Sequence, residues 1–152
     1  MHKTLNKIIH SLFRDVTAFG GMVFYGVIFC LTLLFQRYNL ALKLFLGLLI
    51  TFIIVILIRM VYFKNRPHKQ SHANFIERID ASSFPSWHAA RITFICLTFL
   101  YFISETSFTI FLLIFTLLVC YSRIYLRKHD WKDVIAGIIL GAATYFALLF
   151  FI

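Results

Sequence analysis

Residues 44–58 read LFLGLLITFIIVILI, an uncharged run that ends at Arg59 and approaches the roughly 20 residues of a membrane-spanning helix. Other apolar runs lie at 16–36, 92–104, 106–122 and 134–152. The run at 92–104 is short, and it spans a bilayer only if residues 87–91 extend its helix and Arg91 faces protein, water or headgroups. The sequence therefore predicts an all-α, polytopic membrane bundle of about five transmembrane helices.

The composition separates this chain from soluble proteins. Hydrophobic residues make up 61% of its 152 residues, whereas the apolar share of a soluble domain is about half. The formal net charge is +9, but the basic residues lie beside the apolar runs instead of in a polar domain. We therefore expect membrane lipids and a phosphorylated lipid as partners, and no nucleic acid. The three cysteines lie inside apolar runs, which predicts buried thiols.

The order of the segments predicts one membrane domain over residues 1–152. Residues 1–15 place apolar side chains at helical spacing, which indicates an interfacial amphipathic helix in front of a bundle formed by residues 16–152. No internal repeat is present. Gly137 and Gly141 form a pair of small residues four apart, which either permits close helix packing or is merely tolerated.

The polar connections predict the orientation of the bundle. Counting spans puts the amphipathic helix and the loops at 64–84 and 127–132 on one side of the membrane. Of the 15 Lys and Arg residues, only Arg37 and Lys43 lie toward the other side. The count predicts a multi-pass protein of the cell membrane, and by the positive-inside rule it favours a cytoplasmic loop-bearing side. Because Arg59, Arg66 and Arg123 can be basic for chemical reasons in either orientation, the outer face stays the alternative.

His129 and Asp133 are the first candidate pair for chemistry. They lie four residues apart, which brings two side chains to one face of a helix. Asp133 can then accept the Nδ1 proton of His129 and leave Nε2 free to attack phosphorus. The simpler alternative is a histidine at a helix start paired with a nearby acid.

Three arginines lie at the ends of apolar runs. Arg59 and Arg66 bracket the end of the second run, and Pro67 fixes the chain that follows them. Arg123 lies at the end of a later run, six residues before His129. Each guanidinium either binds a phosphate by charge-assisted hydrogen bonds or reaches outward to lipid headgroups.

The sequence Pro85-Ser86-Trp87-His88 opens the third predicted span. The unpaired backbone N–H groups at a helix start attract anions. Ser86 either donates its hydroxyl to a phosphate oxygen or simply caps the helix. His88 can protonate a departing oxygen, and Trp87 is most simply an aromatic anchor at the interface.

Together these residues resemble the signature of the type 2 phosphatidic acid phosphatase (PAP2) superfamily of membrane lipid phosphatases. The family pattern is Lys, six residues, Arg-Pro; then Pro-Ser-Gly-His; then Ser-Arg, five residues, His, three residues, Asp. The corresponding segments here are 59–67, 85–88 and 122–133. The last is matched in full by Ser122, Arg123, His129 and Asp133, and the resemblance covers about residues 52–142.

The resemblance implies a metal-independent phosphatase without a cofactor. It implies that His129 is the nucleophile, that Asp133 orients it and that His88 is the general acid. The phosphate-binding positions that it implies are Arg59, Arg66, Ser86, Trp87 and Arg123. The chain departs from the pattern at Arg59, where the family has lysine, and at Trp87, where it has glycine. The larger indole must either turn outward or narrow the pocket.

We therefore expect a lipid phosphatase that removes the terminal phosphate of a polyprenyl diphosphate, such as undecaprenyl diphosphate, through a phosphohistidine. A phosphatidate or phosphatidylglycerophosphate phosphatase is the nearest alternative. A non-catalytic lipid-phosphate binder or transporter is another, if Trp87 closes the site. A metal or haem protein using His88, His129 and Asp133 is disfavoured, because the neighbouring arginines repel a cation.

Overall fold

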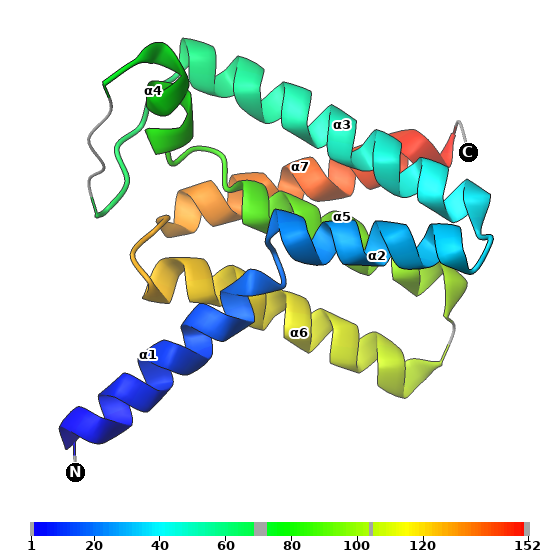
Figure 1. The fold of residues 1–152 in the computed structure, drawn as a ribbon, viewed down its shortest axis with the longest axis horizontal. Helices are drawn as coiled ribbons and strands as arrows, with labels where there is room; N and C mark the ends of the chain where they lie inside the picture. Colours follow the sequence, from blue (N-terminus) through cyan, green and yellow to red (C-terminus); the bar gives the residue numbers. More distant parts are fainter. Residues whose placement is uncertain (1, 69–72, 104, 151–152) are drawn as a thin grey trace.

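The computed structural model describes residues 2–68, 73–103 and 105–150, which fold into helices without a strand. The helices are α1 (His2–Ala18), α2 (Met22–Leu34), α3 (Tyr38–Val61), α4 (Phe75–Ala81), α5 (Trp87–Phe102), α6 (Thr106–Tyr125) and α7 (Trp131–Leu149). The all-α prediction is confirmed. Figure 1 shows α2, α3, α5, α6 and α7 running roughly along one axis, with α1 leaving the bundle at an angle.

The number of spans differs from the prediction of five. Helices α3, α6 and α7 are each long and apolar enough to cross a membrane, whereas α5 is a shorter apolar helix. The helix of the first apolar run is interrupted between α1 and α2, whose axes are bent by 44° relative to each other. The two helices together count as a fourth candidate span if a span may contain such a bend. Three to four candidate spans are therefore present in the described part of the chain. The sequence analysis missed the break, because the apolar run continues through it.

Helix α5 lies at the centre of the bundle and packs against α3, α6 and α7. Gly137 and Gly141 of α7 face the α5 backbone so closely that an added Cβ would overlap the carbonyl groups of Ser86 and Ala90. The predicted close packing at this glycine pair is confirmed. Because α7 carries Asp133 and α5 begins with the Pro85–His88 segment, this contact holds two motifs together.

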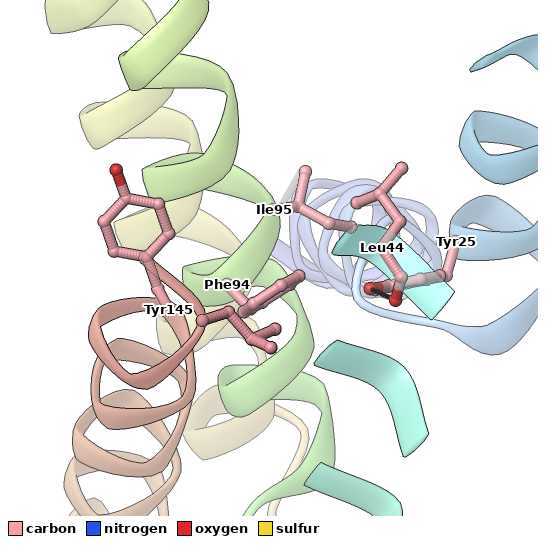
Figure 2. Close-up of a cluster of buried hydrophobic side chains, with 6 residues drawn as sticks. Tyr25, Leu44, Phe94, Ile95 and Tyr145 are labelled. Atoms are coloured by element: carbon pink, nitrogen blue, oxygen red, sulfur yellow. Dashed lines mark hydrogen bonds between the residues drawn. The ribbon is translucent and has the colours of Figure 1, made fainter. Parts of the chain in front are cut away.

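A buried hydrophobic cluster fixes α2 and α3 against the central helices (Figure 2). The Tyr25 hydroxyl donates to the Leu44 carbonyl at 2.7 Å, which joins α2 to α3. Phe94 of α5 fills the space above Gly47 of α3, where a Cβ would overlap the ring. Inside a membrane bundle such a ring stabilises the helix contact through van der Waals packing. This cluster keeps α5 in a fixed position relative to α3.

Helix α1 is amphipathic, as predicted for residues 1–15, but it continues to Ala18 and packs on α6. The Phe13 ring lies 5.6 Å from the Tyr121 ring and 4.4 Å from the Tyr125 ring, measured between centroids. Other apolar side chains of α1, including Leu5 and Leu12, remain exposed. The helix therefore presents an apolar face for a membrane interface while its end reaches the bundle.

The segments that carry the three motifs gather at one end of the bundle (Figure 1). This end contains α4, the chain between α3 and α4, the start of α5 and the loop between α6 and α7. The turns between α2 and α3 and between α5 and α6 lie at the opposite end. Chain segments far apart in sequence are thereby brought close enough to form one site.

Candidate active site

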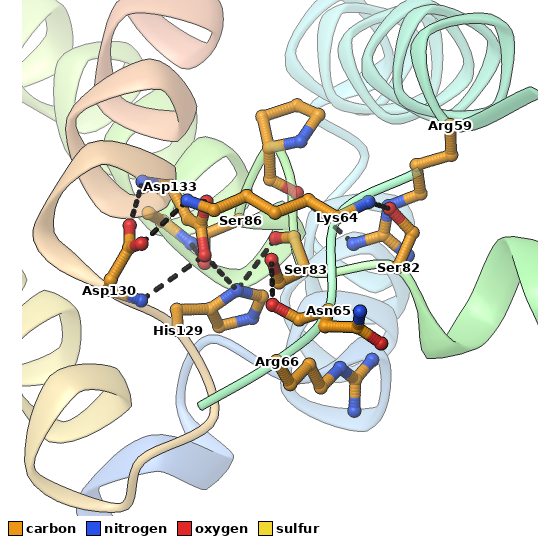
Figure 3. Close-up of polar contacts among 12 residues, drawn as sticks. Arg59, Lys64, Asn65, Arg66, Ser82, Ser83, Ser86, His129, Asp130 and Asp133 are labelled. Atoms are coloured by element: carbon orange, nitrogen blue, oxygen red, sulfur yellow. Dashed lines mark hydrogen bonds and ion pairs between the residues drawn. The ribbon is translucent and has the colours of Figure 1, made fainter. Parts of the chain in front are cut away.

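The start of α7 forms a network with the loop after α3 (Figure 3). Asp130 and Asp133 form a capping box, in which each side chain accepts a hydrogen bond from the other residue's backbone N–H. The Lys64 ammonium lies 2.6 Å from a carboxylate oxygen of each. Burial by itself lowers the pKa of Lys64, but its hydrogen bonds to the two aspartates outweigh this effect and raise it. The network fixes the fully buried Asp133 carboxylate.

His129 is buried in the loop just before α7. Its Nδ1 lies 2.8 Å from the Ser83 carbonyl oxygen and 3.7 Å from Oδ2 of Asp133. The predicted hydrogen bond from His129 to Asp133 is therefore replaced by one to a backbone carbonyl, with Asp133 at ion-pair distance. Since a carbonyl only accepts, Nδ1 of His129 must carry a proton. In the neutral ring, Nε2 then has the free lone pair that a nucleophile requires.

The surroundings of His129 favour this neutral form. Burial lowers the pKa of His129, and the nearby cations of Arg123 and Arg66 lower it further. Asp133 acts in the opposite direction and raises it. The net direction is downward, so the imidazole is neutral at pH 7.

Arg59 and Arg66 are held by backbone carbonyls near the end of α4. Arg59 donates to the carbonyls of Ile79 at 3.3 Å and Pro85 at 3.1 Å, and Arg66 donates to the Asp80 carbonyl at 2.6 Å. Within the described residues, the Nε–H group of each is buried without a partner. Each guanidinium is thus positioned through some of its N–H groups and retains another donor.

Arg123 is positioned by a helix that the sequence analysis did not connect with the site. Its guanidinium donates to the Thr17 hydroxyl of α1 at 2.8 Å. The side chain is only 8% exposed and turns into the protein, so it does not reach outward to headgroups. Helix α1 therefore contributes to the site as well as presenting an apolar face.

Ser86 is the N-cap residue of α5, as the simpler of its two predicted roles requires. Its side chain accepts from the Ala89 N–H at 3.5 Å, and its own N–H donates to the Asp133 carbonyl at 2.9 Å. Ser86 is fully buried and lies behind the wall of the cavity described next, as does Asp133.

One cavity of about 430 Å³ brings most of the predicted residues together. Its walls are formed by Gly21, Met22, Arg59, Arg66, Asp80, Trp87, His88, Arg91, Arg123 and His129. Both histidines thus face the same space, together with four guanidinium groups. The Trp87 indole forms part of the wall and leaves this volume open.

A purely apolar groove adjoins the polar cavity. It has a volume of about 180 Å³ and is lined by Met22, Phe45, Leu48, Leu49, Phe52 and Trp87. Met22 and Trp87 line both spaces, so the two are neighbours. An amphiphile with an anionic head and a hydrocarbon tail matches this pair of environments.

Several residues of the site carried no clear sequence signal. Lys64 lies inside the first motif, between two arginines, and its role follows only from the tertiary contact with α7. Arg91 lies three residues after His88, so helical spacing alone could have placed it in the same cavity. Ser83 contributes a backbone carbonyl, which every residue type possesses.

Among the described residues, no group of three His, Cys, Asp or Glu side chains is arranged to hold a metal ion. The described residues therefore provide no three-ligand set for the metal alternative. The cations that face the cavity are guanidinium groups of the chain itself.

Comparison with known proteins gives a family and a fold. A search of curated proteins finds no match. The crystal structure of Aquifex aeolicus LpxE is similar, with a TM-score of 0.78 and 20% sequence identity over 93% of this chain and 86% of that one. This likeness extends to the bundle as a whole. The family model of the PAP2 superfamily matches residues 40–152, which include all three motifs. The chain therefore belongs to the PAP2 superfamily.

Proposed function

We propose that this protein is an integral membrane phosphatase that removes the terminal phosphate of a polyprenyl diphosphate through a phosphohistidine intermediate. The family and the fold support a membrane lipid phosphatase. The observation that carries the mechanism is the position of His129 in a cavity with four guanidinium groups, its Nδ1 proton held by the Ser83 carbonyl.

In the first step, Nε2 of His129 attacks the terminal phosphorus, and the bond from phosphorus to the bridging oxygen breaks. His88 gives a proton to that oxygen, which leaves as the lipid monophosphate. Arg59, Arg66 and Arg123 bind the oxygens of the transferred phosphoryl group. Because the His129 ring gains positive charge as it attacks, Asp133 stabilises it from 3.7 Å.

In the second step, water attacks the phosphohistidine, and His88 accepts the proton from this water. The phosphorus–nitrogen bond breaks, inorganic phosphate leaves, and His129 returns to its neutral form. His88 is then protonated again for the next cycle. Neither step changes an oxidation state. His88 and water transfer every proton in the two steps.

The apolar groove supports a lipid substrate. Its lining contains no polar surface and shares Met22 and Trp87 with the cavity. A hydrocarbon chain in this groove would bring its phosphorylated end to Trp87, at the edge of the arginine cluster. The site then opens at the end of the bundle that carries most basic residues, which we assign to the cytoplasmic face of the cell membrane.

The test is phosphate release by purified protein in detergent, with undecaprenyl diphosphate, phosphatidate and phosphatidylglycerophosphate as substrates. We expect turnover of the diphosphate, unchanged by a chelator, and a loss of at least about a thousandfold in His129→Ala. The matched control is His68→Ala, an exposed histidine outside the cavity.

Four results would contradict parts of this proposal. Full activity in His129→Ala would show that His129 is not the nucleophile. Loss of activity in the presence of a chelator would contradict the metal-independent route. If the protein hydrolyses phosphatidate or phosphatidylglycerophosphate but not the diphosphate, that lipid is the substrate instead of a polyprenyl diphosphate. Tight binding of all three lipids without phosphate release would instead identify a lipid-phosphate binder.

A further inference from the structure

Arg91 is a fourth guanidinium in the cavity and lies outside the three motifs. It is 5% exposed and comes one helical turn after His88 in α5. Among the described residues, the hydrogen-bond partners of its terminal nitrogens are the Met22 sulfur at 3.4 Å and Nδ1 of His88 at 3.5 Å. Thioether sulfur is a weak acceptor, and 3.5 Å is long for a hydrogen bond. Arg59, Arg66 and Arg123, in contrast, each donate to an oxygen.

Arg91 also lies against Trp87. The guanidinium carbon is 4.8 Å from the centre of the indole, within the range of a cation–π contact. The indole ring in turn lies 4.9 Å from the Phe52 ring of α3. Trp87 thus supports the Arg91 side chain from the wall that separates the cavity from the apolar groove.

Both residues hold buried donors that find no acceptor in the described part of the chain. These are the Nε–H of Arg91 and the Nε1–H of Trp87. Each unpaired buried donor costs about 1–3 kcal/mol. Since both residues line the cavity, an anionic ligand there would supply the missing acceptor oxygens.

The charges in the cavity exceed what one phosphoryl group needs. Four guanidinium groups face one carboxylate, Asp80, in the cavity wall. A phosphate monoester carries a charge of about −1.5 to −2 near pH 7, and a diphosphate carries one further charge. The three motif arginines match a single phosphoryl group, and Arg91 remains for a second.

We infer that Arg91, supported by Trp87, is a specificity-determining residue that binds the second phosphoryl group of a lipid diphosphate. This inference rests on the proposed function and narrows its substrate class. The terminal phosphoryl group lies against His129, and the one retained by the lipid lies against Arg91.

The experiment compares farnesyl diphosphate with farnesyl monophosphate, which have the same tail and differ by one phosphoryl group. We expect wild-type protein to prefer the diphosphate. Arg91→Met should lower kcat/KM about thirtyfold for the diphosphate and about threefold for the monophosphate, as expected for the loss of one charge-assisted contact. Arg91→Lys should restore part of the preference. Lys132→Met, which removes an exposed cation from α7, should leave both rates unchanged.

The outcomes separate the inference from the proposed function. If Arg91→Met lowers kcat/KM equally for both substrates, or for neither, the proposed role of Arg91 is wrong, but the proposed phosphatase activity is unaffected. Wild-type turnover of the monophosphate alone would overturn the role of Arg91 as well. Turnover of neither substrate would contradict the proposed function itself. If Arg91→Met does not fold, competitive inhibition of the wild type decides: inorganic diphosphate should inhibit at least tenfold more tightly than inorganic phosphate, and equal inhibition would overturn the inference.

Discussion

Lys43 and Lys64 lie toward opposite ends of the bundle and are held in different ways. The Lys43 ammonium, in α3, lies 5.4 Å and 5.3 Å from the ring centres of Tyr101 and Tyr145, and no ion pair to it is found among the described residues. The Lys64 ammonium contacts two carboxylates at 2.6 Å.

The two arrangements have different consequences for chemistry. Aromatic rings surround Lys43 with weak, undirected attraction, which suits a cation that only has to be buried. At the site end, Lys64 fixes Asp133, carbonyls hold Arg59 and Arg66, and the Thr17 hydroxyl holds Arg123, while the Nε–H groups of these arginines have no acceptor in the described part of the chain. A cation that is held by hydrogen bonds from some of its N–H groups has a fixed position and keeps its other N–H groups for an anion.

Among the tests of this contrast between the two ends, the largest effect is expected for Asp133→Asn. Asparagine keeps an acceptor for the Asp130 N–H but removes the charge that stabilises the His129 ring during attack. We expect kcat to fall on the order of a hundredfold or more. The measurement is steady-state phosphate release, with thermal unfolding as the control for folding. A change of less than threefold would mean that the Ser83 carbonyl alone orients His129.

Lys64→Met tests the network itself. It leaves the buried Asp133 without its cation, so we expect a loss of about 2 kcal/mol in stability and about tenfold in kcat. Thermal unfolding in detergent and phosphate release measure the two effects. Lys64→Arg, which keeps the charge, should recover most of both. Wild-type stability in Lys64→Met would show that the loop after α3 is held by other contacts.

A smaller effect is expected on the pKa of His129, whose titration reports directly on the charges around the ring. Its pKa should lie below the usual value of about 6.5, because burial and the arginines outweigh Asp133. The neutral nucleophile therefore persists as the pH falls, and Asp133→Asn should lower the pKa further. Histidine ring carbon NMR, with the signal assigned by its loss in His129→Ala, measures both values. A midpoint at or above 6.5 would contradict the assigned environment.

The smallest effect is expected for Lys43→Met. Loss of two cation–π contacts should cost about 1 kcal/mol or less, because the charge no longer has to be buried. Phosphate release should stay within about twofold of the wild type. A tenfold loss of activity would show that the two ends are coupled, and the contrast between them would no longer hold.

Much of this molecule follows from the one-dimensional pattern of its residues. The apolar runs predict the long helices, and close helix packing is one of two alternatives for Gly137 and Gly141, which the structure places against α5. The motif spacing places Arg123, His129 and His88 at one end of the bundle. These features depend on local periodicity or on residue types with few structural alternatives.

The missed features depend on tertiary contacts. Apolar side chains continue across the 44° break in residues 16–36, and its local mark is the Gly20-Gly21 pair, a turn signal that the apolar pattern outweighed in the prediction. The contact of Thr17 with Arg123 joins residues 106 positions apart. The Ser83 carbonyl replaces Asp133 as the acceptor for His129 through the path of the backbone, which side-chain types do not specify.

The shortness of α5 has a consequence for where hydrolysis occurs. Its 16 residues measure about 24 Å at 1.5 Å per residue, several ångströms less than the roughly 30 Å hydrocarbon layer. Figure 1 shows α5 beginning deeper in the bundle than the point where α3 ends. With the far end of α5 at the opposite boundary, the proposed scission would take place beneath the plane of the surrounding headgroups. The thickness of the host bilayer would then govern how far a lipid must sink before it reacts.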